Sequence, residues 1–372
     1  MRRVAILGAA QTRMEACKAS LAYNELVYGV VREVLDRTGV SMREIESMVT
    51  ASQDAYDGKT ISGMAINEVV GAYLKSEAKV AADGLQALLY GVARILSGEF
   101  DLTLVVAHCK ESEGDPAAIT GLMFDPFVQR PLHLDELTAA ALQARRYCRK
   151  KGLSPEDVAL VSVKAHRQAL KNPYAQRAGM FSVSDVLASP LLADPIHELE
   201  AAPHSDGACA LLLASEERAR AHTDHPVFIV GIGNCTDAYW TERDLAEARA
   251  LQEAARRAYA MAGIREPARE IHVAEISARY AHEELMAIEA LGLHPNPVEL
   301  IAQERAAFIN PSGGPLCGNP PTVSGLLRAV EAYAQLSGEA GARQIEGART
   351  ALAHGAGGIC GQNQTVVILQ RE

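Results

Sequence analysis

Hydrophobic and polar positions follow one pattern that the chain uses twice. A short apolar run at 4–12 leads into a helical stretch and then into a second apolar run at 47–52. The same order returns from 227–236 to 273–278. Short apolar runs predict buried strands, and apolar residues spaced three or four apart predict amphipathic helices. We therefore predict two similar α/β halves, each built from strands and helices in the same order.

The repeat continues through a long helix in each half. The segment 81–98 matches the segment 319–338, since each has an early glycine, apolar residues at helical spacing and a final Leu-Ser-Gly. Gly98 and Gly338 occupy the place where a glycine commonly ends a helix. Apolar runs that predict further strands follow at 102–108 and 208–214 in the first half and at 350–354 and 365–370 in the second.

The boundary between the halves is predicted in the polar, proline-containing segment 221–226. We assign 1–221 to an N-terminal half and 222–372 to a C-terminal half. An insertion at about 110–200 interrupts the repeat in the first half. Its apolar spacing predicts helices at 137–150 and 154–170.

Composition excludes several classes of function. The chain has 372 residues, of which 48% are hydrophobic, and a net charge of −10. It has no long basic run, which argues against a nucleic-acid partner, and no run near the roughly 20 apolar residues of a membrane helix. Its seven cysteines form no C-x-x-C pair, which argues against a disulfide framework and against a zinc site. We expect a cytoplasmic protein with reduced thiols and no bound metal.

Four motifs in the chain have a recognisable form. N-P-S-G-G at 310–314 precedes a tight turn, and S-D-G-A-C-A at 205–210 closes the first half. The other two are K-A-H-R-Q-A-L-K-N-P-Y-A-Q at 164–176 and E-I-S-A-R-Y-A-H-E-E-L-M-A-I-E-A-L-G-L at 275–293. Together they resemble the thiolase superfamily, and in particular its sterol-carrier-protein-type subgroup. The resemblance covers essentially the whole chain and implies a layered α-β-α-β-α core with a helical loop insertion.

The resemblance also implies chemistry on acyl-CoA thioesters. In the family, a thiolate in a C-x-S-G turn attacks a carbonyl while nearby donors stabilise the oxyanion. The turn stands at a helix start, which lowers the pKa of a thiol. No cofactor is implied beyond the coenzyme A thioester as substrate or ligand.

Three catalytic stations of the family are altered in this sequence. Ala81 stands at the nucleophile position, so no sulfur is present there. Asn319 replaces the histidine of the G-H-P turn, and Ser277 replaces the histidine of the H-D-x-F segment. The glycines and scaffold motifs around them remain. Three simultaneous replacements indicate either a changed catalytic mechanism or no catalysis.

Several residues remain as candidates for chemistry at these stations. Asn319 can donate a hydrogen bond to an oxyanion, or it can simply cap the following helix. His354 is the best titratable candidate, and Tyr280 is either a phenol acid–base group or an aromatic wall. His282 is a site residue or an exposed helix residue, and Asp83 has its simplest role as a helix cap.

The remaining glycine-rich turns and cysteines have less specific roles. The resemblance implies that the pantetheine of an acyl-CoA lies against two turns, formed by Ser312, Gly313, Gly314, Gly357 and Gly358. Cys317 and Cys360 lie on loops that meet at the site, but neither matches a catalytic position of the family. A small buried apolar residue is the ordinary role for each.

Three hypotheses for function stay open. The altered stations slightly favour a non-catalytic subunit of a hetero-oligomeric thiolase or acyltransferase, which forms a homodimer or a heterodimer with a second thiolase-like chain. One alternative is a cysteine-independent retro-aldolase that cleaves a β-hydroxyacyl-CoA, with Tyr280 and His354 as the acid–base pair. The other is an acyl-CoA-binding or lipid-binding protein. A small zinc-ribbon/OB-fold protein is a further possible partner implied by the resemblance.

Overall fold

The computed structural model describes residues 2–372 and confirms the predicted repeat. The first half contains β1 (Val4–Gln11), α1 (Tyr23–Thr38), β2 (Ser47–Ala51), α2 (Asp54–Asp57), β3 (Ser76–Val80), α3 (Gly84–Leu96), β4 (Leu102–Lys110), β7 (Asp206–Ser215) and α8 (Glu216–His222). The second half contains β8 (Val227–Thr236), α9 (Arg249–Ala262), α10 (Pro267–Glu270), β9 (Val273–Ile276), α11 (Ala281–Ala290), α12 (Pro297–Ala302), α13 (Ser324–Ser337), β10 (Thr350–Gly357) and β11 (Asn363–Arg371).

The pairing of the strands is the same in both halves. In the first half β2 pairs parallel with β4, β4 antiparallel with β7, and β7 antiparallel with β1. In the second half β9, β10, β11 and β8 pair in the corresponding way. The two sets join where Val4 of β1 lies opposite Ile229 of β8, which gives one nine-stranded sheet. Strand topology therefore repeats along with the sequence pattern.

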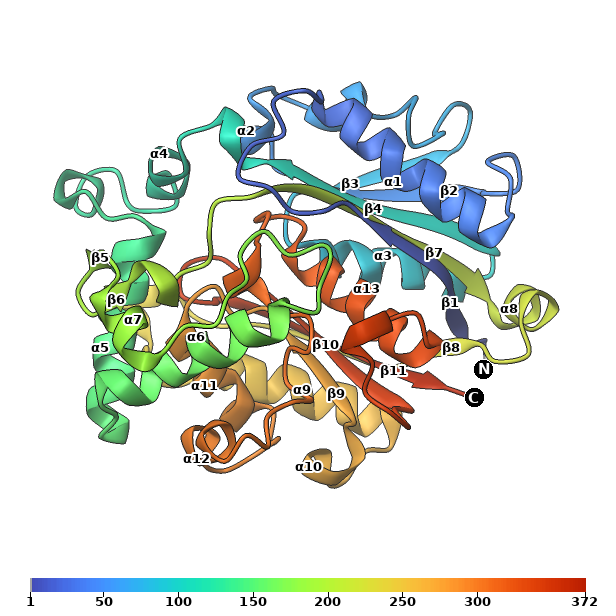
Figure 1. Ribbon diagram of the computed structural model, residues 1–372. Helices are drawn as coiled ribbons and strands as arrows, with labels where there is room; N and C mark the ends of the chain where they lie inside the picture. Colours follow the sequence, from blue (N-terminus) through green and yellow to red (C-terminus); the bar gives the residue numbers. More distant parts are fainter. Residues whose placement is uncertain (1) are drawn as a thin grey trace.

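Helices and strands form the five layers that the resemblance implied (Figure 1). The apolar faces of α3 and α13 lie between the strands of the two halves and share one core with both. α1 covers the outer face of the first half, and α9 covers the outer face of the second. This arrangement follows from composition: α3 and α13 must be apolar on several sides because sheet surrounds them.

The insertion forms a separate helical lobe beside the layers (Figure 1). Both predicted helices are present, and the lobe adds two shorter helices and a two-stranded hairpin. Its elements are α4 (Pro116–Gly121), α5 (Glu136–Lys151), α6 (Pro155–Ala169), α7 (Val183–Ala188), β5 (Leu191–Ala193) and β6 (Ile196–His197). Within residues 2–372 no helix is long and apolar enough to cross a membrane.

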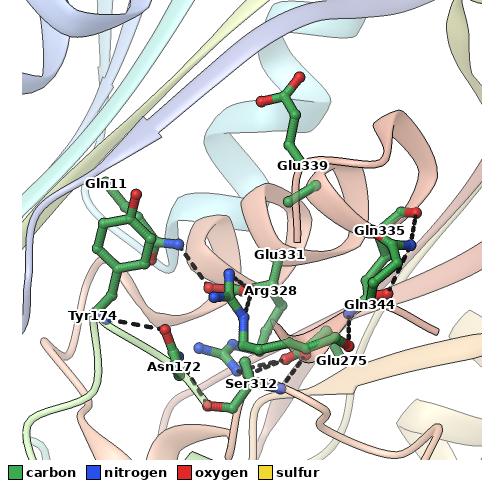
Figure 2. A network of polar contacts seen from close by, with 12 residues as sticks. Gln11, Asn172, Tyr174, Glu275, Ser312, Arg328, Glu331, Gln335, Glu339 and Gln344 are labelled. Carbon is green, nitrogen blue, oxygen red and sulfur yellow. Dashed lines mark hydrogen bonds and ion pairs between the residues drawn. The ribbon is translucent and has the colours of Figure 1, made fainter. Parts of the chain in front are cut away.

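A network of buried polar side chains holds α13 in place (Figure 2). The guanidinium of Arg328 on α13 contacts the carboxylate of Glu275 on β9 at 2.6 Å and the hydroxyl of Ser312 at 2.9 Å. One turn further along α13, Glu331 accepts hydrogen bonds from Gln11 and from Arg343. A buried charge is tolerated only when it is paired and hydrogen-bonded, so these contacts fix the position of the central helix.

Removing one partner of the Arg328–Glu275 pair leaves a buried charge without compensation. We predict that Arg328→Leu lowers the free energy of unfolding by about 3–5 kcal/mol. Urea denaturation followed by circular dichroism measures this change. Arg256→Leu is the matched control, because Arg256 is exposed and pairs with Glu253 within one helix. Similar losses in both variants would contradict the prediction.

Candidate functional site

One partly open cavity brings several of the expected site residues together. It has a volume of about 50 Å³ and lies between α5, the N-terminal end of α9, α11 and the end of β10. Ser277, His354, Gly357 and Gly358 line it, and so does Cys360. Of the predicted catalytic stations, the structure therefore unites Ser277 and His354.

His354 has a hydrogen-bonding pattern that defines its tautomer. Gln364 donates from Nε2 to the carbonyl of Gly361 at 2.7 Å, so its Oε1 faces the imidazole as an acceptor. His354 Nε2 lies 2.6 Å from that oxygen and must carry the ring proton. Nδ1 is then an unprotonated acceptor, and it has no partner among residues 2–372. Burial lowers the pKa of His354 to about 4, so the ring is neutral at pH 7.

Five charged residues that the sequence analysis did not predict as site residues line the same cavity: Glu136, Arg243, Glu247, Arg279 and Glu283. Arg279 forms an ion pair with Glu136 of the insertion. Glu283 accepts backbone hydrogen bonds at 2.8 Å from Arg279 and at 3.3 Å from Tyr280. Burial raises the pKa of the Glu283 carboxyl to about 7, and the nearby Glu136 adds to this effect. For Arg279 and Glu283, the available signal was the charged stretch 279–284, which follows β9 and Ser277.

Tyr280 does not share the cavity with His354. It is the N-cap residue of α11 and packs against α5 and β6, in a cluster with Ala140, Ala144 and Ile196. Desolvation raises the pKa of its phenol well above the usual value. The expected acid–base pair of Tyr280 and His354 is therefore not brought together, and the aromatic-wall interpretation describes the position of Tyr280 better.

His282 is buried, so its interpretation as an exposed helix residue is wrong. Its Nε2 lies 3.2 Å from Oε1 of Gln143, and its ring stacks near Tyr280. Burial lowers the pKa of His282 to about 3. The residue is a neutral member of the packing between α11 and α5.

Asn319 does not cap the following helix, as one alternative expected. α13 begins at Ser324, and its N-cap residue is Val323. The backbone N–H of Asn319 donates to the hydroxyl of Ser205 at 2.9 Å, while its side-chain oxygen is buried without a partner among the described residues. Asn319 is absent from the lining of the cavity that holds His354.

The missing cap is supplied by Asp83, as its simplest role predicted. The carboxylate accepts hydrogen bonds at 2.9 Å from Leu85 at the start of α3 and from Gly325 at the start of α13. A Cβ on Gly325 would lie 1.8 Å from Asp83 Oδ1, so only glycine leaves room for the shared cap. Burial raises the pKa of Asp83 to about 6. Ala81, two residues earlier, is exposed and presents only a methyl group.

The two glycine-rich turns have different environments. Gly357 and Gly358 line the cavity, whereas Ser312, Gly313 and Gly314 are buried. The hydroxyl of Ser312 donates to Glu275 at 2.7 Å, which commits it to the network around α13. The structure therefore does not bring the two turns together around a single ligand space.

No thiol at the site is activated. Burial raises the pKa of both Cys317 and Cys360 to about 12, so both are protonated at neutral pH. Cys317 lies 3.7 Å from His166 inside the core, away from the cavity. In the part of the chain that the structure describes, no group of three or more His, Cys, Asp or Glu is placed to hold a metal ion.

The buried neutral state of His354 predicts a pH-dependent stability. A depressed pKa means that the unfolded chain binds the proton more readily, so stability is complete above about pH 6.5 and falls as the pH drops toward 4. We predict that His354→Gln removes a dependence of the order of 3 kcal/mol between these pH values. Urea midpoints of both proteins at pH 7 and pH 4.5 measure it. An identical pH slope in the two proteins would rule out this account of His354.

The sequence also matches known proteins. A family model described as thiolase C-terminal domain-like matches residues 233–371. An acetyl-CoA acetyltransferase of Methanothermobacter thermautotrophicus is 29% identical, with 97% of this chain and 98% of the relative aligned. Sterol carrier protein 2 of Bos taurus is 34% identical over 57% of this chain, and the alignment spans 42% of that longer protein.

The fold has solved counterparts as well. A structure described as Ltp2-ChsH2(DUF35) aldolase superposes with a TM-score of 0.84 and covers 99% of this chain and 97% of its own. Its sequence identity is 20%, so this likeness concerns the fold. The family match over residues 233–371, the near full-length relative and the repeated strand topology together support the thiolase superfamily.

Proposed function

We propose that this protein cleaves a carbon–carbon bond of a β-hydroxyacyl-CoA by a retro-aldol reaction that uses no covalent intermediate. The observation that carries the proposal is the imidazole of His354, which is neutral, held in one tautomer by Gln364 and left with a free Nδ1 lone pair. A general base needs an unprotonated, oriented nitrogen of this kind, and substrate binding would have to raise the lowered pKa of His354 toward the working pH. Ala81 supplies no nucleophile, so chemistry through a thioester on the enzyme is not available to this chain.

The reaction requires one base and one acid. His354 Nδ1 takes the proton of the β-hydroxyl group, and the oxygen forms a carbonyl as the Cα–Cβ bond breaks. The bonding pair moves to Cα and delocalises into the thioester as an enolate. A proton delivered to Cα then gives the shortened acyl-CoA. Cationic donors such as the Arg279 guanidinium stabilise the enolate oxygen. No oxidant, reductant or cofactor takes part.

A basic hollow beside the cavity supports a coenzyme A thioester as the ligand. This hollow has a volume of about 360 Å³, and it shares Glu247 and Ala248 with the cavity that holds His354. Lys150, Lys151 and Arg249 line it, where Lys150 and Arg249 pair with Glu247 and Lys151 pairs with Glu289. Phosphate groups would replace these carboxylates as partners of the cations. We infer that the phosphates lie in this hollow and that the pantetheine reaches the cavity past Gly357 and Gly358.

The relatives supply the acyl-CoA class and a precedent for lyase chemistry. The acetyltransferase relative is named for acetyl-CoA. The structure that superposes with a TM-score of 0.84 is described as an Ltp2-ChsH2(DUF35) aldolase. By analogy, we propose a small zinc-ribbon/OB-fold protein as a possible partner of this chain.

The edge strand β3 supports self-association or pairing with a second thiolase-like chain. β3 is the outermost strand of the sheet, and large apolar side chains near it are exposed, including Tyr73 at 81%, Leu74 at 88% and Ile61 at 70%. An unpaired edge with apolar neighbours is a ready site for strand addition. We propose a dimer through this edge.

A non-catalytic subunit is the second candidate. The observation that favours it is that Ala81 has no sulfur, while Cys317 and Cys360 have strongly raised pKa values. In this case an active chain with an intact cysteine would pair with this one. Its CoA hollow would then serve binding or assembly alone.

Comparison of His354→Gln with the parent protein tests the proposed function. The purified protein is incubated with β-hydroxyacyl-CoA substrates of different chain length, and aldehyde or ketone and shortened acyl-CoA are measured. We expect His354→Gln to lower kcat by about 100-fold or more, the usual contribution of a general base. His225→Gln, at an exposed position, is the matched control.

The native mass of the parent protein separates the two candidates. Cleavage by a pure homodimer, with or without a small partner, supports the lyase. A parent protein that cleaves none of the substrates and copurifies with a cysteine-bearing thiolase-like chain contradicts the lyase and favours the non-catalytic subunit.

A further inference from the structure

Glu283 lies in the same cavity as His354 and uses only one of its two carboxyl oxygens. Oε2 accepts the backbone N–H groups of Arg279 and Tyr280 at the start of α11. No hydrogen bond from residues 2–372 reaches Oε1. The carboxyl lines the cavity beside His354, Arg279 and Cys360. One oxygen is therefore structural, and the other is available to a ligand.

Helix capping alone does not account for a carboxyl in this place. Glu25 does the same capping at the start of α1, where its carboxylate is exposed to water and accepts from Ala22 at 2.8 Å. A glutamine would accept the same N–H groups without the cost of placing a titratable acid in this cavity. The position of Glu283 therefore indicates a second role, one that uses the titratable proton of its carboxyl group.

The groups around Glu283 keep that proton exchangeable near neutral pH. Glu136 of α5 repels the ionised form, whereas Arg279, on the segment before α11, favours it. Arg243, which precedes α9, and His354 of β10 complete the charged and titratable lining together with Glu247 and the thiol of Cys360. Because opposing influences surround it, both protonation states are accessible to the carboxyl.

We propose that Glu283 is the acid that delivers the proton to Cα of the thioester enolate. This inference rests on the proposed retro-aldol reaction and assigns its second proton transfer. The O–H bond of the Glu283 carboxyl breaks, a C–H bond forms at Cα, and the enolate electrons collapse into that new bond. The carboxylate regains its proton from water after product release. His354 therefore takes the proton from the β-hydroxyl oxygen, and Glu283 supplies the proton to Cα.

Exchange of hydrogen for deuterium at Cα of the product tests this step without cleavage. Acetyl-CoA and propionyl-CoA are incubated with the protein in D₂O, and deuterium in the acyl group is followed by mass spectrometry. The reverse of the proposed step removes a Cα proton with the Glu283 carboxylate and returns a deuteron. The exchange involves no hydroxyl group, so it does not need His354.

We expect opposite patterns in two variants. Glu283→Gln keeps the cap of α11, as an unchanged urea midpoint will verify, and loses exchange by about 100-fold or more. His354→Gln loses cleavage but keeps exchange within a few-fold of the parent. Glu283→Asp, which retains an acid, recovers part of the exchange. Glu25→Gln makes the same chemical change at a cap remote from the cavity and leaves both reactions unaltered.

The outcomes separate the two levels of the proposal. A parent protein that cleaves β-hydroxyacyl-CoA while Glu283→Gln still exchanges at the parental rate overturns the role of Glu283 and leaves the proposed function standing. A parent protein that neither cleaves nor exchanges overturns both. Cleavage by the parent, combined with exchange that is lost in Glu283→Gln and kept in His354→Gln, supports both.

Discussion

The buried pair of Arg328 and Glu275 is the contact on which the arrangement of the second half depends. Glu275 lies on strand β9, and its carboxylate contacts both Arg328 of α13 and the hydroxyl of Ser312 in the following turn. Two residues beyond Glu275 the chain reaches Ser277, whose hydroxyl lies 2.9 Å from Ser324 at the start of α13. A shift of the ion pair would move the strand end, the central helix and the wall of the cavity together. Such a pair fixes the relative position of the elements it joins more than it raises the free energy of unfolding, because desolvation of the two charges offsets much of their attraction.

The polypeptide path was largely predictable from the sequence, because burial on two sheet faces imposes strict apolar patterns. The repeated apolar runs predicted the strands, and the final Leu-Ser-Gly of each helical segment predicted where α3 and α13 end. The directions of side chains were not predictable in the same way. Tyr280 and Ser277 are three residues apart, yet the backbone turn between them sends Tyr280 toward the insertion and leaves Ser277 at the cavity. Sequence spacing alone does not define that turn.

The charged lining of the cavity shows the same limit more strongly. Arg279 and Glu136 are 143 residues apart and come from a strand end and from the inserted lobe. Nothing in either local sequence identifies the partner. The motifs identify Ala81 and Asn319 as departures from the family pattern, but they carry no signal for Arg279 and Glu136. The titratable groups Glu283 of α11 and His354 of β10 share the cavity with only one of the altered stations, Ser277.

The shared cap at Asp83 determines the electrostatic environment that a thiol at position 81 would have. The N-terminal ends of α3 and α13 both point at this carboxylate, which carries a negative charge at pH 7 because its pKa is about 6. The positive potential that two helix starts would otherwise offer to a thiolate is thereby neutralised. A cysteine placed at position 81 would lie two residues from this anion, which disfavours its thiolate form. A thiolate at this helix start would therefore require a second substitution at Asp83.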